Sequence, residues 1–276
     1  MGKFDGTLIC TDLDGTLLKN DKTVSRENRE AIAYFMAEGG YFTFITGRMP
    51  YFVKDILAKV SINAPFGCIN GGGIYDPVAG KYIWTQPIRD DVIELVRYVD
   101  QNTEDMGIQI NCFEHLYFSR ENETMEYFRQ ATGLPNLVRD YEDIDEPIAK
   151  ILFGDYREDR LLGVKALLDA HPRRDDFDYI RSEHSLYEIL PKGVSKGTLL
   201  ARMAEHLQVP MGRTVAVGDY YNDVSMLRAA GIGVAVENAT TDAKAAADHI
   251  TVSNENHALA RIITDLDEGA LRLPPL

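Results

Sequence analysis

Two aspartates separated by a single residue follow a short apolar run near the start of the chain. The run is Leu-Ile-Cys at 8–10, and TDLDGTLL at 11–18 then brings Asp12 and Asp14. Alternate residues of an extended chain face the same way, and like charges this close oppose each other's ionisation. A divalent cation is the usual group that offsets such repulsion, so the spacing points to metal chemistry.

Other polar residues follow further β-rich runs. They are Thr16 after the first run, Thr46 and Gly47 after the second, Asn70 after the third, and Gly218, Asp219, Asn222 and Asp223 after the fourth, with Lys196 near the start of a helix. In an open α/β sheet, ligands bind outside the carboxyl ends of the strands, so we expect these side chains to face one crevice. Taken alone, DLDG would be an acidic turn and GDYYND a surface turn with helix caps. Because both motifs follow strands, and TGR lies between them in the sequence, a functional site is favoured over surface turns.

The converging acids indicate which metal the crevice would bind. Carboxylates are costly to bury without partners, so a cluster of four predicts a metal site. Hard oxygen ligands with no nearby His or Cys favour Mg²⁺ over zinc, and Mg²⁺ commonly bridges carboxylates to a substrate phosphate.

Strands alternate with helices in the first and last thirds of the chain. We expect strands at 7–10, 41–45, 66–69, 214–217 and 233–236, and helices at 25–40, 50–60, 195–207, 223–230 and 241–247. Ser25 can cap the first helix, and Pro50 can begin the second. This rhythm predicts one doubly wound, parallel sheet covered on both faces.

The middle of the chain has a different rhythm. We expect helices at 90–101, 122–132 and 157–169, and strands at 107–113, 115–119, 148–153 and within 177–190. Paired strands joined by short turns predict a mostly antiparallel sheet with helices on one face. We therefore expect an inserted domain at 87–190 between core segments 1–86 and 191–276; one continuous α/β domain is the alternative.

Composition excludes several classes of function. Asp and Glu outnumber Lys and Arg by 43 to 29, a net charge of −14, which argues against binding to a nucleic-acid backbone. Cys10, Cys68 and Cys112 lack CxxC spacing, and we interpret them as reduced core residues. We find no signal peptide, no myristoylation pattern and no apolar run that would span a membrane, so we expect a cytoplasmic protein.

These motifs resemble those of the haloacid dehalogenase (HAD) superfamily. LICTDLDGT is similar to its first motif, FITG to its second, Lys196 in GVSKG to its third and GDYYND to its fourth. INGGG and EILPKGVSKG resemble the segments that flank the type IIB cap of the Cof-like phosphatases. The resemblance implies a Rossmann-like α/β core with a doubly wound parallel sheet and an inserted α+β cap domain.

The resemblance also implies catalytic roles. Asp12 would be the nucleophile that forms an aspartyl-phosphate, and Asp14 the general acid and base. Mg²⁺ would be held by Asp12, by the Asp14 backbone carbonyl and by Asp219, with Asp223 acting through water or orienting its neighbours.

Phosphate would be held by a second set of residues. Thr46, Gly47, Lys196 and Asn222 would bind it, with Gly47 admitting a close backbone approach. Lys192 is a competing lysine, but Lys196 fits the SKG pattern. Arg48 would contact substrate or form a surface ion pair. Tyr220 stands where a small polar residue is frequent in the family, and either packing or stacking on substrate would explain it.

The function that the resemblance implies is Mg²⁺-dependent hydrolysis of a small phosphomonoester, with sugar phosphates as the expected class. Alternatives are a phosphosugar mutase with the same phosphoenzyme, and a non-catalytic protein that binds a phosphorylated metabolite. A dehalogenase is disfavoured because Asp14 would have no role there. Specificity residues would lie in the cap, where His115, Tyr117, Arg120, His184 and Tyr187 are candidates that packing explains equally well. The oligomeric state stays open between monomer and dimer.

Overall fold

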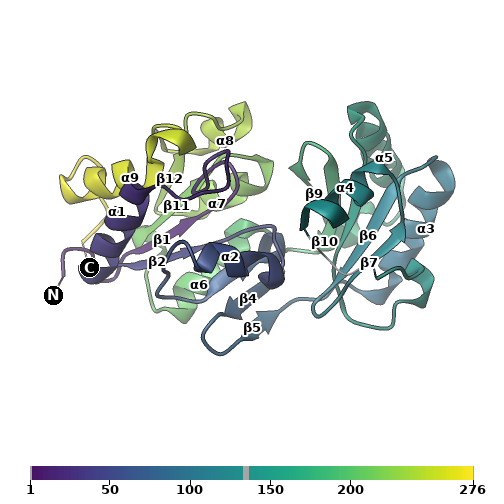
Figure 1. Cartoon of the computed structure of the whole chain (residues 1–276), viewed down its shortest axis with the longest axis horizontal. Helices are drawn as coiled ribbons and strands as arrows, with labels where there is room; N and C mark the ends of the chain where they lie inside the picture. The colour runs from purple at the N-terminus through teal and green to yellow at the C-terminus, as the bar shows by residue number, and fades with distance from the viewer. Residues whose placement is uncertain (1, 133–136, 276) are drawn as a thin grey trace. The chain divides into compact units, whose positions relative to one another are not determined.

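The chain folds into two compact units in a computed structural model (Figure 1). The structure describes residues 2–132 and 137–275. Unit 1 comprises Met1–Thr85 and Ser195–Leu276, and unit 2 comprises Gln86–Val194. Within the described ranges, no helix is both long enough and apolar enough to cross a membrane.

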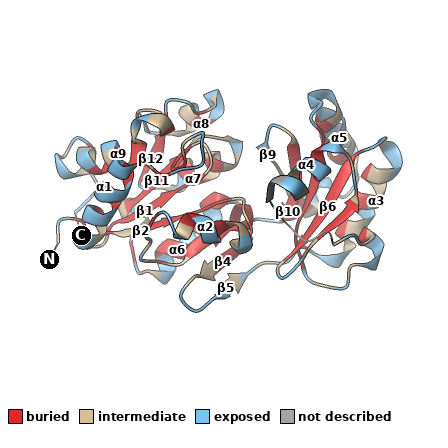
Figure 2. Ribbon diagram, in the orientation of Figure 1, coloured by how far each residue is buried: buried red, intermediate tan, exposed pale blue. Residues whose placement is uncertain are grey.

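Unit 1 is built on a parallel sheet of five strands in the order β13-β12-β11-β1-β2. The strands are β1 (Leu8–Thr11), β2 (Tyr41–Phe44), β11 (Thr214–Gly218), β12 (Ile232–Ala235) and β13 (His249–Ile250). Every residue of β1, β11 and β12 is buried, as Figure 2 shows in red. Apolar residues on both sides of each strand therefore form the core, and the predicted parallel sheet is confirmed.

The helices of unit 1 cover both faces of this sheet. They are α1 (Arg26–Ala37), α2 (Lys54–Leu57), α6 (Lys196–His206), α7 (Val224–Ala229), α8 (Thr241–Ala246) and α9 (Ala258–Asp267). α1 packs against α9, and α6 packs against α7. Because crossovers between parallel strands are right-handed, β1–α1–β2 and β11–α7–β12, which run outward in opposite directions, place their helices on opposite faces. The chain therefore reverses its direction across the sheet between β1 and β11.

Two expectations for the first third of the chain are wrong in part. The segment 50–60 is not one helix, since a 3₁₀ turn at Pro50–Val53 precedes the short α2. The run at 66–69 extends the parallel sheet by a single bridge, between Ile45 and Gly67, and not by a full ladder. Instead, β3 (Phe66–Cys68), β4 (Gly73–Asp76) and β5 (Lys81–Thr85) form a separate antiparallel sheet. The physical reason is the tight turn at Ile69–Gly71, which reverses the chain so that β4 pairs antiparallel with β3.

Unit 2 is an antiparallel sheet with helices on both faces. Its strand order is β7-β6-β8-β10-β9, made of β6 (Gly107–Cys112), β7 (Leu116–Arg120), β8 (Ile148–Gly154), β9 (Phe177–Glu183) and β10 (Leu186–Pro191). The helices α3 (Ile93–Asn102) and α5 (Glu158–Ala170) share a core with Ile151 and Phe153.

α4 (Glu123–Thr132) lies on the other face of that sheet. Its Met125 packs with Leu152, the residue between Ile151 and Phe153 on β8. Successive strand residues face opposite ways, so the expectation that all helices lie on one face is wrong. α4 lies on this second face because its apolar residues Met125 and Phe128 pack there against the sheet.

Candidate active site

The reversal between β1 and β11 places two acids side by side. Asp12 directly follows β1, and Asp219 directly follows β11. These strands are paired in parallel, and the Asp12 N–H donates to the Val217 carbonyl oxygen at 2.8 Å. A reversal of this kind opens a crevice at the carboxyl ends of a parallel sheet, so both carboxylates lie where such folds bind ligands.

Lys196 bridges Asp12 and Asp223, although it lies far from Asp12 in the sequence. Its Nζ lies 2.5 Å from Asp12 Oδ1 and 2.6 Å from Asp223 Oδ1. The lysine is the first residue of α6, whose start is capped by Ser195 accepting from the Thr198 N–H. Lys196 and Asp223 are both fully buried. An ammonium group buried between two carboxylates is a strong electrostatic arrangement, because little solvent screens it.

The third acid is held beside this pair. Oxygen atoms of Asp12, Asp219 and Asp223 all lie within 4.8 Å of one another. Thr16 Oγ1 donates to Asp219 Oδ1 at 2.8 Å. Asp223 Oδ2 accepts from the backbone N–H groups of Asp219 and Tyr220 at 2.9 and 3.0 Å. Hydrogen bonds from Lys196, from Thr16 and from the backbone thus fix the three carboxylates, and one oxygen of each lies close to the other two.

The electrostatics of the cluster follow from its burial. Burial raises the pKa of Asp12 well above its usual value, although the charge of Lys196 opposes the shift. Burial and the charge of Asp223 raise the pKa of Asp219 to about 7. Burial alone would lower the pKa of Lys196, but the two carboxylates outweigh it and raise that pKa. One ammonium group cannot balance three acids.

The donor set fits a hard divalent cation. The three converging ligand atoms are all carboxylate oxygens, which is the ligand chemistry that Mg²⁺ and Ca²⁺ prefer and that zinc sites seldom use alone. A dication would also balance the charge that Lys196 leaves uncompensated. Asp12, Asp219 and Asp223 could therefore hold a metal; the Asp14 side chain is not in this group.

Asp14 has different partners. Arg48 donates to both of its carboxylate oxygens at 2.7 Å, and Lys22 Nζ donates at 2.8 Å. Burial would raise the pKa of Asp14, but the hydrogen bonds and charges of Arg48 and Lys22 outweigh it and lower the pKa to about 2. The sequence left Arg48 open between a substrate contact and an ion pair; here it forms an ion pair. Lys22 was missed, since nothing in its neighbourhood of the sequence marks it.

The residues expected to bind phosphate approach the cluster from neighbouring loops. Ile45, which precedes Thr46, donates its N–H to the Thr11 carbonyl oxygen beside Asp12. Asn222 Nδ2 donates to Asn70 Oδ1 at 3.0 Å. The sequence placed Asn70 at a strand end without giving it a role, and the structure brings it into contact with one of the predicted site residues.

The side chains of several other candidates contact partners outside the acid cluster. Lys192 belongs to unit 2 and pairs with Asp178 at 3.1 Å. His115 and Tyr117 both contact Glu146, and Arg120 pairs with Asp100 and Asp140. Tyr187 is part of the core of unit 2, and His184 contacts Arg181. Tyr220 stacks edge-on against Tyr221, with the ring centroids 4.9 Å apart.

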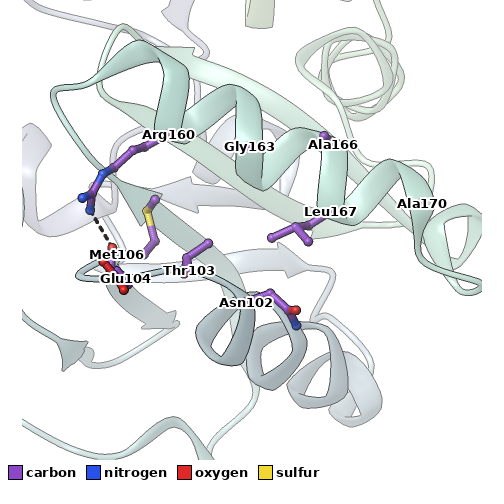
Figure 3. Close-up of a pocket in the computed structure, with 9 residues that line it drawn as sticks. All are labelled: Asn102, Thr103, Glu104, Met106, Arg160, Gly163, Ala166, Leu167 and Ala170. Atoms are coloured by element: carbon purple, nitrogen blue, oxygen red, sulfur yellow. Dashed lines mark hydrogen bonds between the residues drawn. The ribbon is translucent and has the colours of Figure 1, made fainter.

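Unit 2 contains a cavity of about 580 Å³ (Figure 3). It is bounded by the end of α3, the loop at 103–106 and α5, where Arg160 donates to the Glu104 carbonyl oxygen at 2.6 Å. The surface of its lining is mostly apolar, with contributions from residues such as Met106 and Leu167. It contains none of the predicted site residues and no convergent catalytic groups.

Comparison with known proteins identifies the group to which this chain is similar. The family model of the haloacid dehalogenase-like hydrolases matches residues 9–263. Phosphatase YwpJ of Bacillus subtilis (strain 168) is 29% identical, over 94% of this chain and 99% of the relative. The 5-amino-6-(5-phospho-D-ribitylamino)uracil phosphatase YitU of the same organism is 28% identical, over 94% and 96%.

A solved structure supports the fold. The HAD subclass IIB sugar phosphatase BT4131 superposes with a TM-score of 0.83 at 20% identity, over 95% of this chain and 99% of that chain. The predicted fold class is confirmed, and so is the assignment to the phosphoric monoester hydrolases among the Cof-like proteins. This chain belongs to the haloacid dehalogenase-like hydrolases.

Proposed function

We propose that the protein is a Mg²⁺-dependent phosphatase that hydrolyses a small phosphomonoester through a covalent intermediate on Asp12. The observation that carries the proposal is the buried Lys196 ammonium, which bridges Asp12 and Asp223 while Asp219 lies within reach of both. A nucleophilic carboxylate must stay ionised, and Lys196 stabilises that form of Asp12. The same positive charge would attract a phosphoryl group to the oxygen that attacks it.

The reaction follows from the two acids of the opening motif. An oxygen of Asp12 attacks phosphorus, the bond from phosphorus to the ester oxygen breaks, and Asp14 gives its proton to the departing alkoxide. Asp14 then takes a proton from water, and the resulting hydroxide attacks the phosphorus of the aspartyl-phosphate. The products are an alcohol, inorganic phosphate and the original carboxylates. Since Arg48 and Lys22 keep Asp14 ionised, proton donation requires that this carboxyl group leaves Arg48.

The metal site belongs to the same proposal. Asp12, Asp219 and Asp223 would hold the ion together with the Asp14 backbone carbonyl. When bound, Mg²⁺ would supply positive charge to the oxygens of the transferring phosphoryl group. Thr46, Gly47 and Asn222 would orient the same oxygens through their hydroxyl, backbone N–H and amide groups.

The proposed substrates are small phosphorylated metabolites, with sugar phosphates as the leading class. Support comes from the relatives, since YitU is named for a phosphorylated ribityl compound and BT4131 for sugar phosphates. We also propose that unit 2 corresponds to the inserted type IIB cap domain expected at 87–190. Its place in the chain, between two segments of unit 1, supports this.

Replacement of the nucleophile tests the proposal. With an aryl phosphate and Mg²⁺, the wild-type protein should release phosphate, and Asp12→Asn should lose turnover by at least about 10³-fold because the amide is a poor nucleophile. Asp242→Asn, on the exposed first turn of α8, serves as the matched control. Undiminished turnover in Asp12→Asn would refute the assignment. A panel of sugar phosphates, with both free phosphate and isomerised product measured, would then separate hydrolysis from mutase activity.

A further inference from the structure

The turn at Ile69–Gly71 holds three consecutive residues in the left-handed region of backbone space. The φ angles are 59° at Ile69, 51° at Asn70 and 117° at Gly71. Asn and Gly adopt such angles readily, but a β-branched isoleucine does so rarely and at a cost. A strained backbone of this kind persists only where its surroundings fix it, and it is often found at functional sites.

The surroundings of the turn are the phosphate-binding elements themselves. The Ile69 N–H donates to the Arg48 carbonyl oxygen and the Asn70 N–H to the Thr46 carbonyl oxygen, both at 3.1 Å. A Cβ atom on Gly71 would lie 2.4 Å from the carbonyl oxygen of Ser195, the residue before Lys196. The turn therefore packs between the loop that carries Thr46 and the start of α6, which carries Lys196.

The strained backbone directs one buried side chain at two further site residues. Asn70 is 1% exposed, and its Oδ1 accepts from Asn222 Nδ2 at 3.0 Å. The same amide covers Gly47, where an added Cβ atom would lie 2.9 Å from Asn70 Oδ1 and 3.1 Å from Nδ2. A single amide thus touches both the Asn222 amide and the Gly47 backbone.

We propose that Asn70 is a positioning residue for the phosphate site, an inference that rests on the proposed phosphatase function. A carboxamide nitrogen carries two hydrogens. Asn70 takes one of the Asn222 hydrogens and so aims the other at a phosphoryl oxygen, while the contact with Gly47 keeps that backbone N–H on the same target. The left-handed turn is the device that brings the Asn70 side chain into this position.

A double-mutant cycle between Asn70 and Asn222 tests the proposal. Asn70→Gly keeps the left-handed backbone accessible and removes the amide. We expect it to lower kcat/KM for an aryl phosphate about tenfold, as is usual when an outer partner of a site is lost. In the N70G background, Asn222→Ala should then cost little more, because the Asn222 amide is already misdirected. If Asn222→Ala costs as much in N70G as in the wild type, the proposal is wrong.

Two further variants separate positioning from folding. Asn70→Asp keeps the acceptor oxygen and tolerates left-handed backbone, so in the N70D background Asn222→Ala should cost as much as in the wild type. A smaller cost of Asn222→Ala in N70D than in the wild type would also overturn the proposal, and this comparison decides the matter if N70G does not fold. Gln208→Gly, at another left-handed residue after α6 with φ 57°, should leave kcat/KM unchanged.

A binding measurement distinguishes failure of this inference from failure of the proposed function. Absence of wild-type turnover would refute the phosphatase proposal alone. Calorimetric titration of inorganic phosphate in Mg²⁺ then repeats the same cycle without turnover. Coupled losses of phosphate affinity in the Asn70 and Asn222 variants would support the positioning role, and independent losses, or no phosphate binding by the wild type, would overturn it.

Discussion

Arg48 forms a bidentate ion pair with the Asp14 carboxylate. Its Nε donates to Oδ2 and its Nη2 to Oδ1, each at 2.7 Å. Bidentate pairs of this kind fix orientation as well as charge. The two side chains are 31% and 33% exposed, so the pair is open to solvent and can separate at modest cost. Arg48 therefore helps to hold Asp14 ionised, and under the proposed function substrate binding would have to release Asp14 from this pair.

The role of Asp14 predicts a dependence on the leaving group. Asp14→Asn cannot donate a proton, so an alkyl phosphate should lose about 10³-fold in kcat. An aryl phosphate leaves without assistance and should still phosphorylate Asp12. Because the variant also lacks the base that activates water, the aspartyl-phosphate should accumulate. Rapid-mixing kinetics should then show a burst of phenol equal to the enzyme concentration.

Arg48→Gln is the matched control for that experiment. It breaks the ion pair but leaves the acid in place, so no burst should appear and the alkyl and aryl substrates should change in parallel. Equal losses for both substrates in Asp14→Asn, without a burst, would contradict a role of Asp14 in proton transfer.

The buried lysine predicts a second effect, on stability. Lys196→Met removes the ammonium group that lies between Asp12 and Asp223 and leaves two buried carboxylates adjacent. Removal of one partner from a buried ion pair costs about 3–5 kcal/mol, so the free energy of unfolding should fall by that order in metal-free buffer. Added Mg²⁺ should restore part of the loss, because it supplies the missing positive charge.

Urea denaturation with and without Mg²⁺ measures both parts of this prediction. Lys192→Met is the control, since that lysine is exposed and pairs only at the surface of unit 2, and it should change stability by less than about 1 kcal/mol. A Lys196→Met protein as stable as the wild type would show that the buried charges do not interact as the geometry indicates.

Most of this architecture is readable from local patterns in the sequence, and the failures have a common cause. Short apolar runs that end in Asp12 and in Gly218-Asp219 mark buried parallel strands, because only such strands are apolar on both faces. The run at Phe66–Cys68 has the same local pattern, yet it meets the parallel sheet at one bridge, at Gly67, and pairs along its length antiparallel with β4. The difference lies in the turn that follows, whose left-handed isoleucine could not be anticipated from residue preferences.

The site shows the same limit. The types and spacing of Asp12, Lys196 and Asp219 predict a shared site in the sequence, and the three side chains lie close together in the structure. Lys22 carries no such signal, since a lysine in a polar loop is ordinarily a solvated surface residue, and its contact with Asp14 depends on how the loop folds back. Asn70 was visible only as a residue at a strand end, because its contact with Asn222 joins residues 152 positions apart.

Metal binding can be tested without substrate. If Asp219 is a ligand, Mg²⁺ should raise the midpoint of thermal unfolding of the wild type, by the equivalent of about 2.7 kcal/mol at a hundredfold excess over Kd. Asp219→Asn should lose most of this shift while its metal-free midpoint stays equal or rises, because burial and the charge of Asp223 disfavour the ionised carboxylate. Asp242→Asn should keep the full shift. An unchanged Mg²⁺ shift in Asp219→Asn would exclude it as a ligand.

Asp155 predicts how the stability of unit 2 depends on pH. Its carboxylate accepts from the Arg157 backbone N–H and from Arg157 Nε and Nη2 at 2.8–2.9 Å, just before α5 begins. Burial would raise the pKa of Asp155, but the Arg157 hydrogen bonds and charge outweigh it and lower the pKa. A carboxyl group with a lowered pKa in the folded state stabilises fully above its unfolded pKa of about 3.9 and loses this contribution as the pH falls through the folded value.

Asp155→Asn should therefore lower the free energy of unfolding of unit 2 by about 2 kcal/mol at pH 7, the usual range for hydrogen bonds to a charged group. As the pH falls from the unfolded pKa of about 3.9 towards the lower folded pKa, the wild type loses this contribution, so the gap between the two proteins should narrow. Chemical denaturation between pH 3 and pH 7, followed by a probe in unit 2, measures the gap. Asp175→Asn, whose side chain is 91% exposed, should show almost no gap at any pH. A gap in Asp155→Asn that is constant across this range would mean that the carboxylate charge does not stabilise the start of α5.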